Sequence, residues 1–112
     1  IGDAVMLVAP DPASLLRTSF AVLGAVESEG EDFPQVHIGL ASGPVVNRGG
    51  DWFGSPVNIA SRVSAAARAG SILVTEEVRD AARDDADWSF AGERRLKGLR
   101  APVKLYRARP MP

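Results

Sequence analysis

Residues 48–62 read RGGDWFGSPVNIASR, and this stretch decides how the 112-residue chain is expected to fold. Its two consecutive glycines mark a turn. Beyond the turn, Ser55 is predicted to cap a helix that carries Pro56 in its first turn. Asn58 and Arg62 then lie four residues apart on one helix face, so both side chains could reach the same ligand. The stretch therefore predicts a hairpin followed by a helix with a polar, ligand-binding face.

The residues before this stretch predict a strand, a helix and a second strand. Residues 4–9 are apolar throughout, which favours a central strand buried on both faces. Asp11 is predicted to cap a helix with Pro12 at its first position, ending near Gly30. Large and small residues alternate over 36–40, as in a strand with one larger-residue face.

The residues after residue 62 continue the alternation of helices and strands. The helix of the opening stretch is predicted over about 56–69, followed by a short strand over 71–75 and a brief helix over 76–83. Two strands over 88–96 and 103–108 are predicted to pair antiparallel. Helices that alternate with strands and end in hairpins indicate an α+β fold, with helices packed on a mainly antiparallel sheet.

Composition limits the class of protein. The chain is 46% hydrophobic and has 13 basic and 14 acidic residues, which suits one compact soluble domain. A formal net charge of -1 does not favour nucleic acid as a partner. The absence of cysteine excludes disulfides and zinc thiolate sites, and it is compatible with a reducing cytosol. No apolar run is long enough to span a bilayer.

Several polar residues are candidates for a site, and each also has a structural or solvated alternative. Asp3 precedes a predicted strand, where a carboxylate could ligate a hard cation. Asp51 follows two glycines, although turn carboxylates commonly bond nearby amides. Asn58 gains nothing from helix propensity, so its position indicates a partner. Lys97 could reach a phosphate as a point charge. His37 is expected to be a partly buried, hydrogen-bonded ring and is left out of the site.

Taken together, separated segments of the chain resemble the class III nucleotidyl cyclases, and most of all bacterial, actinobacterial-like adenylate cyclases. The matching segments are residues 1–6, 39–45, 50–54, 57–62 and 97–98. The resemblance implies a ferredoxin-like α+β catalytic domain. Such domains dimerise head to tail, as a homodimer in the simplest case, and convert ATP to cyclic AMP and pyrophosphate at the interface.

The resemblance also implies a role for each candidate. Asp3 would be one of two aspartates that hold two Mg²⁺ or Mn²⁺ ions. Asp51 would accept a hydrogen bond from the adenine amino group. Asn58 would orient the ribose, and Arg62 would stabilise charge while the α-phosphate is attacked. Lys97 would hold the terminal phosphates. Positioning and electrostatics would supply most of the catalysis.

The sequence departs from the family at its start. Family members carry the first metal aspartate in an earlier strand and a purine-selecting lysine just before the Gly2-Asp3 motif, and the sequence has neither. We therefore expect residues 1–112 to be one cyclase domain truncated at its N-terminus and inactive alone. A cytoplasmic location is expected, and membrane tethering of the parent protein stays open. The alternative is a catalytically silent cyclase-like module with a regulatory or dimerising role.

Overall fold

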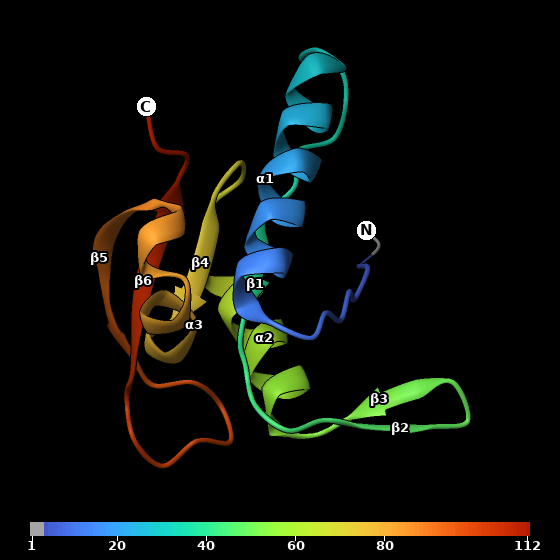
Figure 1. Ribbon diagram of the computed structural model, residues 1–112, viewed down its shortest axis with the longest axis vertical. Helices are drawn as coiled ribbons and strands as arrows, with labels where there is room; N and C mark the ends of the chain where they lie inside the picture. The colour runs from blue at the N-terminus through green and yellow to red at the C-terminus, as the bar shows by residue number, and fades with distance from the viewer. Residues whose placement is uncertain (1–3) are drawn as a thin grey trace.

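The computed structural model describes residues 4–112, in which helices pack against a four-stranded sheet (Figure 1). The strand order is β1-β4-β6-β5. These strands are β1 (Ile38–Leu40), β4 (Ile72–Thr75), β5 (Asp87–Arg94) and β6 (Val103–Arg109). The pair β1–β4 is parallel, whereas β4–β6 and β5–β6 are antiparallel. The α+β prediction is confirmed, with a mixed sheet that is antiparallel in two of its three pairings.

The remaining elements are α1 (Pro12–Ser28), β2 (Val46–Arg48), β3 (Asp51–Phe53), α2 (Ser55–Ala66), α3 (Glu76–Ala81) and a 3₁₀ turn, η1 (Arg83–Asp85). Strands β2 and β3 form a separate antiparallel hairpin that projects from the body (Figure 1). None of the helices in the described part of the chain has both the length and the apolarity needed to cross a bilayer.

The central strand β4 separates two apolar layers. All four of its residues are buried, and alternate side chains point to opposite faces of a sheet. Ile72 and Val74 belong to a cluster that includes Leu16 of α1 and Val78 of α3. Leu73 faces the other way, into a second cluster with α2. Helices α1 and α3 therefore cover one face of the sheet, and α2 covers the other.

The second cluster, on the α2 face, joins the inner side of α2 to the loop between β5 and β6. Its buried members are Val63, Leu73, Leu96 and Leu105, with Ile59, Leu99 and Val103 among the half-buried residues packed against them. Burying a Leu or Val side chain stabilises a fold by about 1.5–3 kcal/mol. This cluster therefore fixes the loop against α2.

Helix α1 begins as its sequence predicts. Asp11 is the N-cap, and its carboxylate accepts hydrogen bonds of 2.9 Å from the backbone N–H and the hydroxyl of Ser14. These bonds stabilise the ionised form, so they lower the pKa of Asp11. Pro12 occupies the first turn, where its missing N–H costs no intrahelical bond.

The start of α2 lies one residue away from its predicted position. The N-cap is Gly54, not Ser55, and no side chain caps this end of the helix. Gly54 has a φ of 143°, a backbone conformation that residues with a Cβ rarely adopt. The need for a glycine at the bend between β3 and α2 thus places the cap at residue 54. The helix ends at Ala66, three residues before the predicted end.

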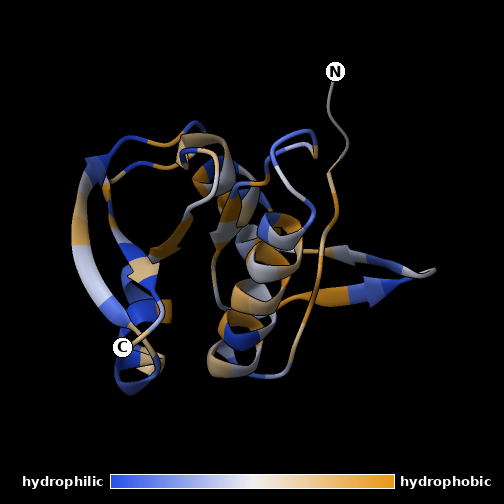
Figure 2. Ribbon diagram, turned by 90° about the horizontal axis from the view of Figure 1, so that it is seen from above, coloured by the Kyte–Doolittle hydropathy of each residue, from blue (hydrophilic) through white to orange (hydrophobic). Residues whose placement is uncertain are grey.

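The prediction of a buried central strand over residues 4–9 is wrong. This segment forms no strand and runs outside the folded body, where its hydrophobic residues are exposed (Figure 2). Val5 is 84% exposed and Met6 is 51% exposed. An apolar run predicts a preference for burial, but a strand also needs a neighbour for its backbone groups. The central positions of this sheet are filled by β4 and β6.

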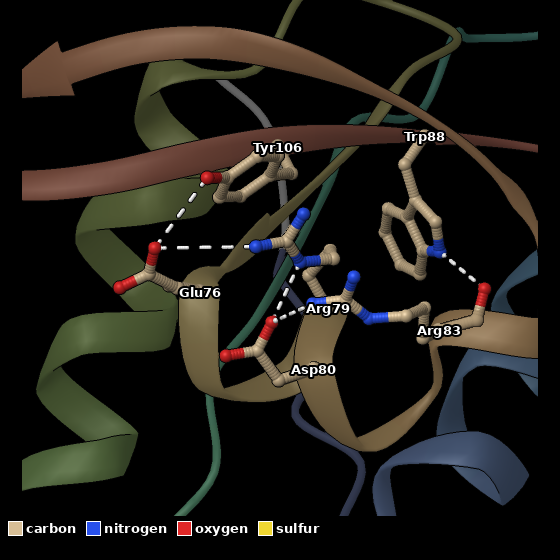
Figure 3. A network of polar contacts seen from close by, with 6 residues as sticks. All are labelled: Glu76, Arg79, Asp80, Arg83, Trp88 and Tyr106. Atoms are coloured by element: carbon tan, nitrogen blue, oxygen red, sulfur yellow. Dashed lines mark hydrogen bonds and ion pairs between the residues drawn. The ribbon is translucent and has the colours of Figure 1, made fainter.

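A polar network fastens α3 to β6 (Figure 3). The Arg79 guanidinium lies 4.1 Å from the centre of the Tyr106 ring, and its Nε donates to Asp80 at 2.8 Å. Tyr106 donates its hydroxyl proton to Glu76 at 3.4 Å, and Arg83 donates to Asp80 at 3.0 Å. The basic residues of α3 and η1 are therefore engaged within the fold and are not available as ligand-binding cations.

Candidate functional site

The hairpin turn sets the position of Asp51. Gly49 and Gly50 have φ values of 59° and 90°, and positive φ at both central residues is the mark of a type I′ hairpin turn. This turn places Arg48 directly opposite Asp51, in register across the two strands. Both side chains are exposed. Asp51 therefore lies at the outer end of the hairpin, not immediately before α2.

The outer face of α2 presents Asn58 and Arg62. Both residues are exposed, whereas Val63 is fully buried on the inner face. The predicted shared face is thus confirmed, because both residues lie in α2 and residues four apart share one face of a helix. Among the described residues, neither side chain has a hydrogen bond or ion pair with another residue. Two polar groups are consequently free to face an external ligand.

A tight turn holds Lys97 at the surface. The backbone N–H of Leu99 donates to the carbonyl of Leu96 at 3.1 Å, and Gly98 between them has a φ of 88°. Leu96 is only 7% exposed, while Lys97 points to solvent. The sequence interpretation identified Lys97 but missed the two leucines that anchor it. Their apolar side chains on either side of an exposed Lys-Gly pair were the available signal.

The candidates do not converge on one closed pocket within residues 4–112. The hairpin carries Asp51 away from the body (Figure 1). One open hollow of about 400 Å³ is lined by Val46, Arg48, Phe53 and Gly54. Another, of about 260 Å³, lies between α2, α3, β5 and β6. Neither hollow is lined by Asp51, Asn58, Arg62 or Lys97.

The predicted metal ligand cannot be placed. Asp3 lies outside the residues that the structure describes. Within residues 4–112, no three carboxylate or histidine side chains come together as a metal ion would require. The described residues alone therefore do not fit a two-metal centre, and none of the chemistry below is routed through one.

The single histidine has a structural contact. His37 Nδ1 donates a hydrogen bond to the backbone carbonyl of Ser64 in α2 at 2.6 Å. The expected hydrogen-bonded ring is confirmed, although His37 is exposed and not partly buried. Because it links the segment just before β1 to α2 and lies on neither the hairpin nor the outer face of α2, His37 stays outside the candidate site.

Comparison with known proteins identifies the class. The family described as the adenylate and guanylate cyclase catalytic domain matches residues 14–108. A pH-sensitive adenylate cyclase of Mycobacterium tuberculosis is 54% identical over 114 residues, which cover 97% of this chain and 28% of that protein. The chain thus spans less than a third of that relative's length.

Solved structures agree with this match. An adenylate/guanylate cyclase/hydrolase from Silicibacter pomeroyi aligns with a TM-score of 0.82 and 26% identity, over 92% of this chain and 64% of that one. The catalytic core of a rhodopsin-guanylyl cyclase with converted specificity, in complex with ATPαS, has the same fold at 23% identity and a TM-score of 0.77, over 92% of this chain and 61% of that one.

The fold and the sequence match together define the class of domain. The chain belongs to the adenylate and guanylate cyclase catalytic domain family.

Proposed function

We propose that residues 1–112 are part of an adenylate cyclase catalytic domain. The reaction converts ATP to cyclic AMP: the ribose 3′-hydroxyl loses its proton to solvent, its oxygen forms a bond to the α-phosphorus, the bond from that phosphorus to the β-phosphate oxygen breaks, and pyrophosphate leaves. The observation that carries this proposal is the exposed face of α2, where Asn58 and Arg62 have no partner within residues 4–112. Adenylate cyclase is also the named activity of the M. tuberculosis relative.

The family resemblance gives each candidate side chain a role, and the chemistry of the side chain supports it. Arg62 is a fixed cation that offsets the charge developing on the α-phosphate, and Asn58, one turn earlier, hydrogen-bonds the ribose region. The Asp51 carboxylate accepts from the adenine amino group. Guanine presents a carbonyl acceptor at the same edge, so a carboxylate there favours ATP over GTP. Lys97 binds the terminal phosphates from the loop between β5 and β6.

Divalent metal is part of the proposed function but not of the described site. Asp3 is proposed as one ligand of a Mg²⁺ or Mn²⁺ pair, which would supply activation of the 3′-hydroxyl when bound. Since residues 4–112 hold no three-donor cluster, further carboxylates are required. We accordingly expect residues 1–112 to be inactive alone.

A second copy of the domain is the proposed partner. The hairpin exposes Val46 and Phe53, which lie opposite each other in register and are 52% and 54% exposed. Paired exposed apolar side chains on a projecting element are typical of a contact surface. Because Asp51, Arg62 and Lys97 form no closed pocket within residues 4–112, a facing domain would complete the site. The cytoplasm, which supplies ATP, is the proposed location.

The test is nucleotide turnover by the full-length protein. ATP or GTP is supplied with Mn²⁺ or Mg²⁺, and cyclic nucleotide is measured by mass spectrometry. Cyclic AMP formation that depends on metal supports the proposal. Binding of ATP without turnover would instead indicate the catalytically silent module. The same assay on a mass-verified 112-residue chain tests its inactivity, and cyclic AMP formation there would contradict that part.

A further inference from the structure

Positive charge is concentrated at the C-terminal end of the chain. Residues 94–112 contain seven basic residues and no acidic residue. Four of the seven lie at the end of β5 and in the loop that follows it. These four, here named the loop cations, are Arg94, Arg95, Lys97 and Arg100, and all are exposed. Although the chain's net charge is -1, its charge is unevenly distributed, and this region is a local positive patch.

The loop cations have different neighbours from Lys104 and Arg109, two basic residues of β6. Lys104 lies opposite Glu93 in the sheet, and Arg109 lies opposite Asp87. Opposite charges that face each other across two strands attract and partly neutralise one another. Within residues 4–112, none of the loop cations is in an ion pair, and Arg94, the one that lies in a strand, is opposite the uncharged Val103. Their electrostatic field is therefore open to solvent and to an approaching anion.

The loop is held in a defined shape. Arg95 Nη1 donates a hydrogen bond to the backbone carbonyl of Arg100 at 3.3 Å, which closes the loop across its base. Leu96 and Leu99 pack into the cluster that contains Val63 of α2. The patch is thus fixed against the inner face of α2. The outer face of α2 carries Arg62, the residue proposed to contact the α-phosphate. A fixed patch loses less conformational entropy on binding than a flexible one.

We propose that Arg94 and Arg100 act with Lys97 to capture the polyphosphate tail of the nucleotide, and that Arg95 is a positioning residue that keeps the loop closed. This inference rests on the proposed function, in which Lys97 alone contacts the terminal phosphates. The size of the patch favours a triphosphate. Three exposed cations in and beside one loop match a short polyanion, whereas nucleic-acid binding uses a basic face or stripe that follows a long backbone.

The first experiment measures binding of inorganic tripolyphosphate to the full-length protein by calorimetry. The double variant Arg94→Gln/Arg100→Gln is expected to bind about tenfold more weakly at about 10 mM salt. At about 1 M salt the difference should largely vanish, because exposed charges are then screened. The control is Arg68→Gln/Arg109→Gln, which removes the same charge at exposed positions outside the loop and should bind like the wild-type protein.

The second experiment separates the role of Arg95 from its charge. Arg95→Gln removes a charge and also the bond that closes the loop. At about 10 mM salt its binding defect should exceed that of Arg94→Gln, because the open loop no longer holds Lys97 and Arg100 in place. Arg95→Lys, which keeps a charge and a donor, should recover much of the binding. Equal defects in the two Gln variants, or no recovery in Arg95→Lys, would overturn the positioning role.

Four other outcomes decide the capture proposal. Equal weakening by the control pair would mean that net charge alone governs binding, and would overturn it. Tighter binding of a single-stranded oligonucleotide than of tripolyphosphate would overturn it in favour of a nucleic-acid surface. If the protein is an active cyclase and Arg94→Gln/Arg100→Gln leaves its KM for ATP unchanged, the capture proposal is overturned while the proposed function stands. Loop-dependent tripolyphosphate binding without cyclic AMP formation would retain it and reject the proposed function.

Discussion

Gly39 of β1 lies directly against the backbone of Ser64 in α2, with no room for a side chain between them. A Cβ placed on Gly39 would meet the Ser64 backbone nitrogen and would lie 2.7 Å from the carbonyl oxygen of Ala60. Both neighbours are helix backbone, which cannot move aside as a flexible side chain can. This contact sets how closely the helix that carries Asn58 and Arg62 approaches the sheet.

Substituting Gly39→Val is expected to lower the free energy of unfolding by about 1–3 kcal/mol, because it overpacks the contact between β1 and α2. Urea denaturation measures the change. The matched control is Gly24→Ala in the interior of α1, where a Cβ would meet nothing within 4 Å. That change should stabilise the protein by about 0.5–1 kcal/mol. Equal effects of the two substitutions would contradict the role assigned to Gly39.

Asp11→Ala is expected to destabilise α1 at neutral pH, because the helix loses the acceptor for the Ser14 N–H. The pKa of Asp11 is lowered in the folded state, chiefly by the Ser14 backbone bond and then by the Ser14 hydroxyl. Its contribution is thus complete above the unfolded pKa and is lost as the pH falls through the folded pKa. Denaturation series should show the difference between wild type and variant shrinking below about pH 4. Asp32→Ala, at an exposed loop position, is the control. A stability difference between wild type and Asp11→Ala that does not change with pH would contradict the prediction.

Arg62→Ala in the full-length protein is expected to reduce kcat for cyclic AMP formation by about 100-fold, as does the loss of one donor to a developing oxyanion. KM for ATP should change far less, because the proposed interaction strengthens in the transition state. Arg68→Ala, an exposed arginine just beyond the same helix, should leave both parameters unchanged. A rise in KM alone would assign Arg62 to ground-state binding instead.

Asp51→Ala is expected to lower kcat/KM for ATP by about 10- to 100-fold, the loss of one hydrogen bond to a charged acceptor. The value for GTP should stay level or rise, since the carboxylate no longer opposes the guanine carbonyl. The measurement compares both nucleotides under the same metal conditions. Removing the opposite residue, with Arg48→Ala, should not change the preference between the two. A parallel loss for ATP and GTP would indicate that Asp51 serves the hairpin and not base selection.

The double variant Val46→Ser/Phe53→Ser is expected to weaken self-association of the full-length protein without lowering its stability. Both side chains are more than half exposed, so the folded monomer loses little buried area. Sedimentation equilibrium gives the dimer dissociation constant, and thermal unfolding at fixed concentration checks the fold. Phe90→Ser, an exposed aromatic substitution on β5, is the control. Unchanged association in the hairpin variant would reject the hairpin as the contact.

Local sequence patterns predicted most of the elements, because their causes lie within a few residues. The Asp11–Ser14 cap, the hairpin turn at Gly49–Gly50 and the shared face of Asn58 and Arg62 each depend on spacing along the chain. Boundaries were less accurate where a bend needed a particular backbone conformation. At Gly54 a positive φ moved the cap of α2 by one residue.

The sequence by itself therefore determined which segments form helices and hairpins, and it indicated the residues that are proposed to bind a nucleotide. Tertiary structure alone decided where those residues stand. It left residues 4–9 without a strand partner and carried Asp51 out on a projecting hairpin. It also joined Leu96 and Leu99 to Val63 across more than thirty residues of chain. Such placements depend on which surfaces bury each other, and burial between distant segments leaves no fixed spacing in the sequence.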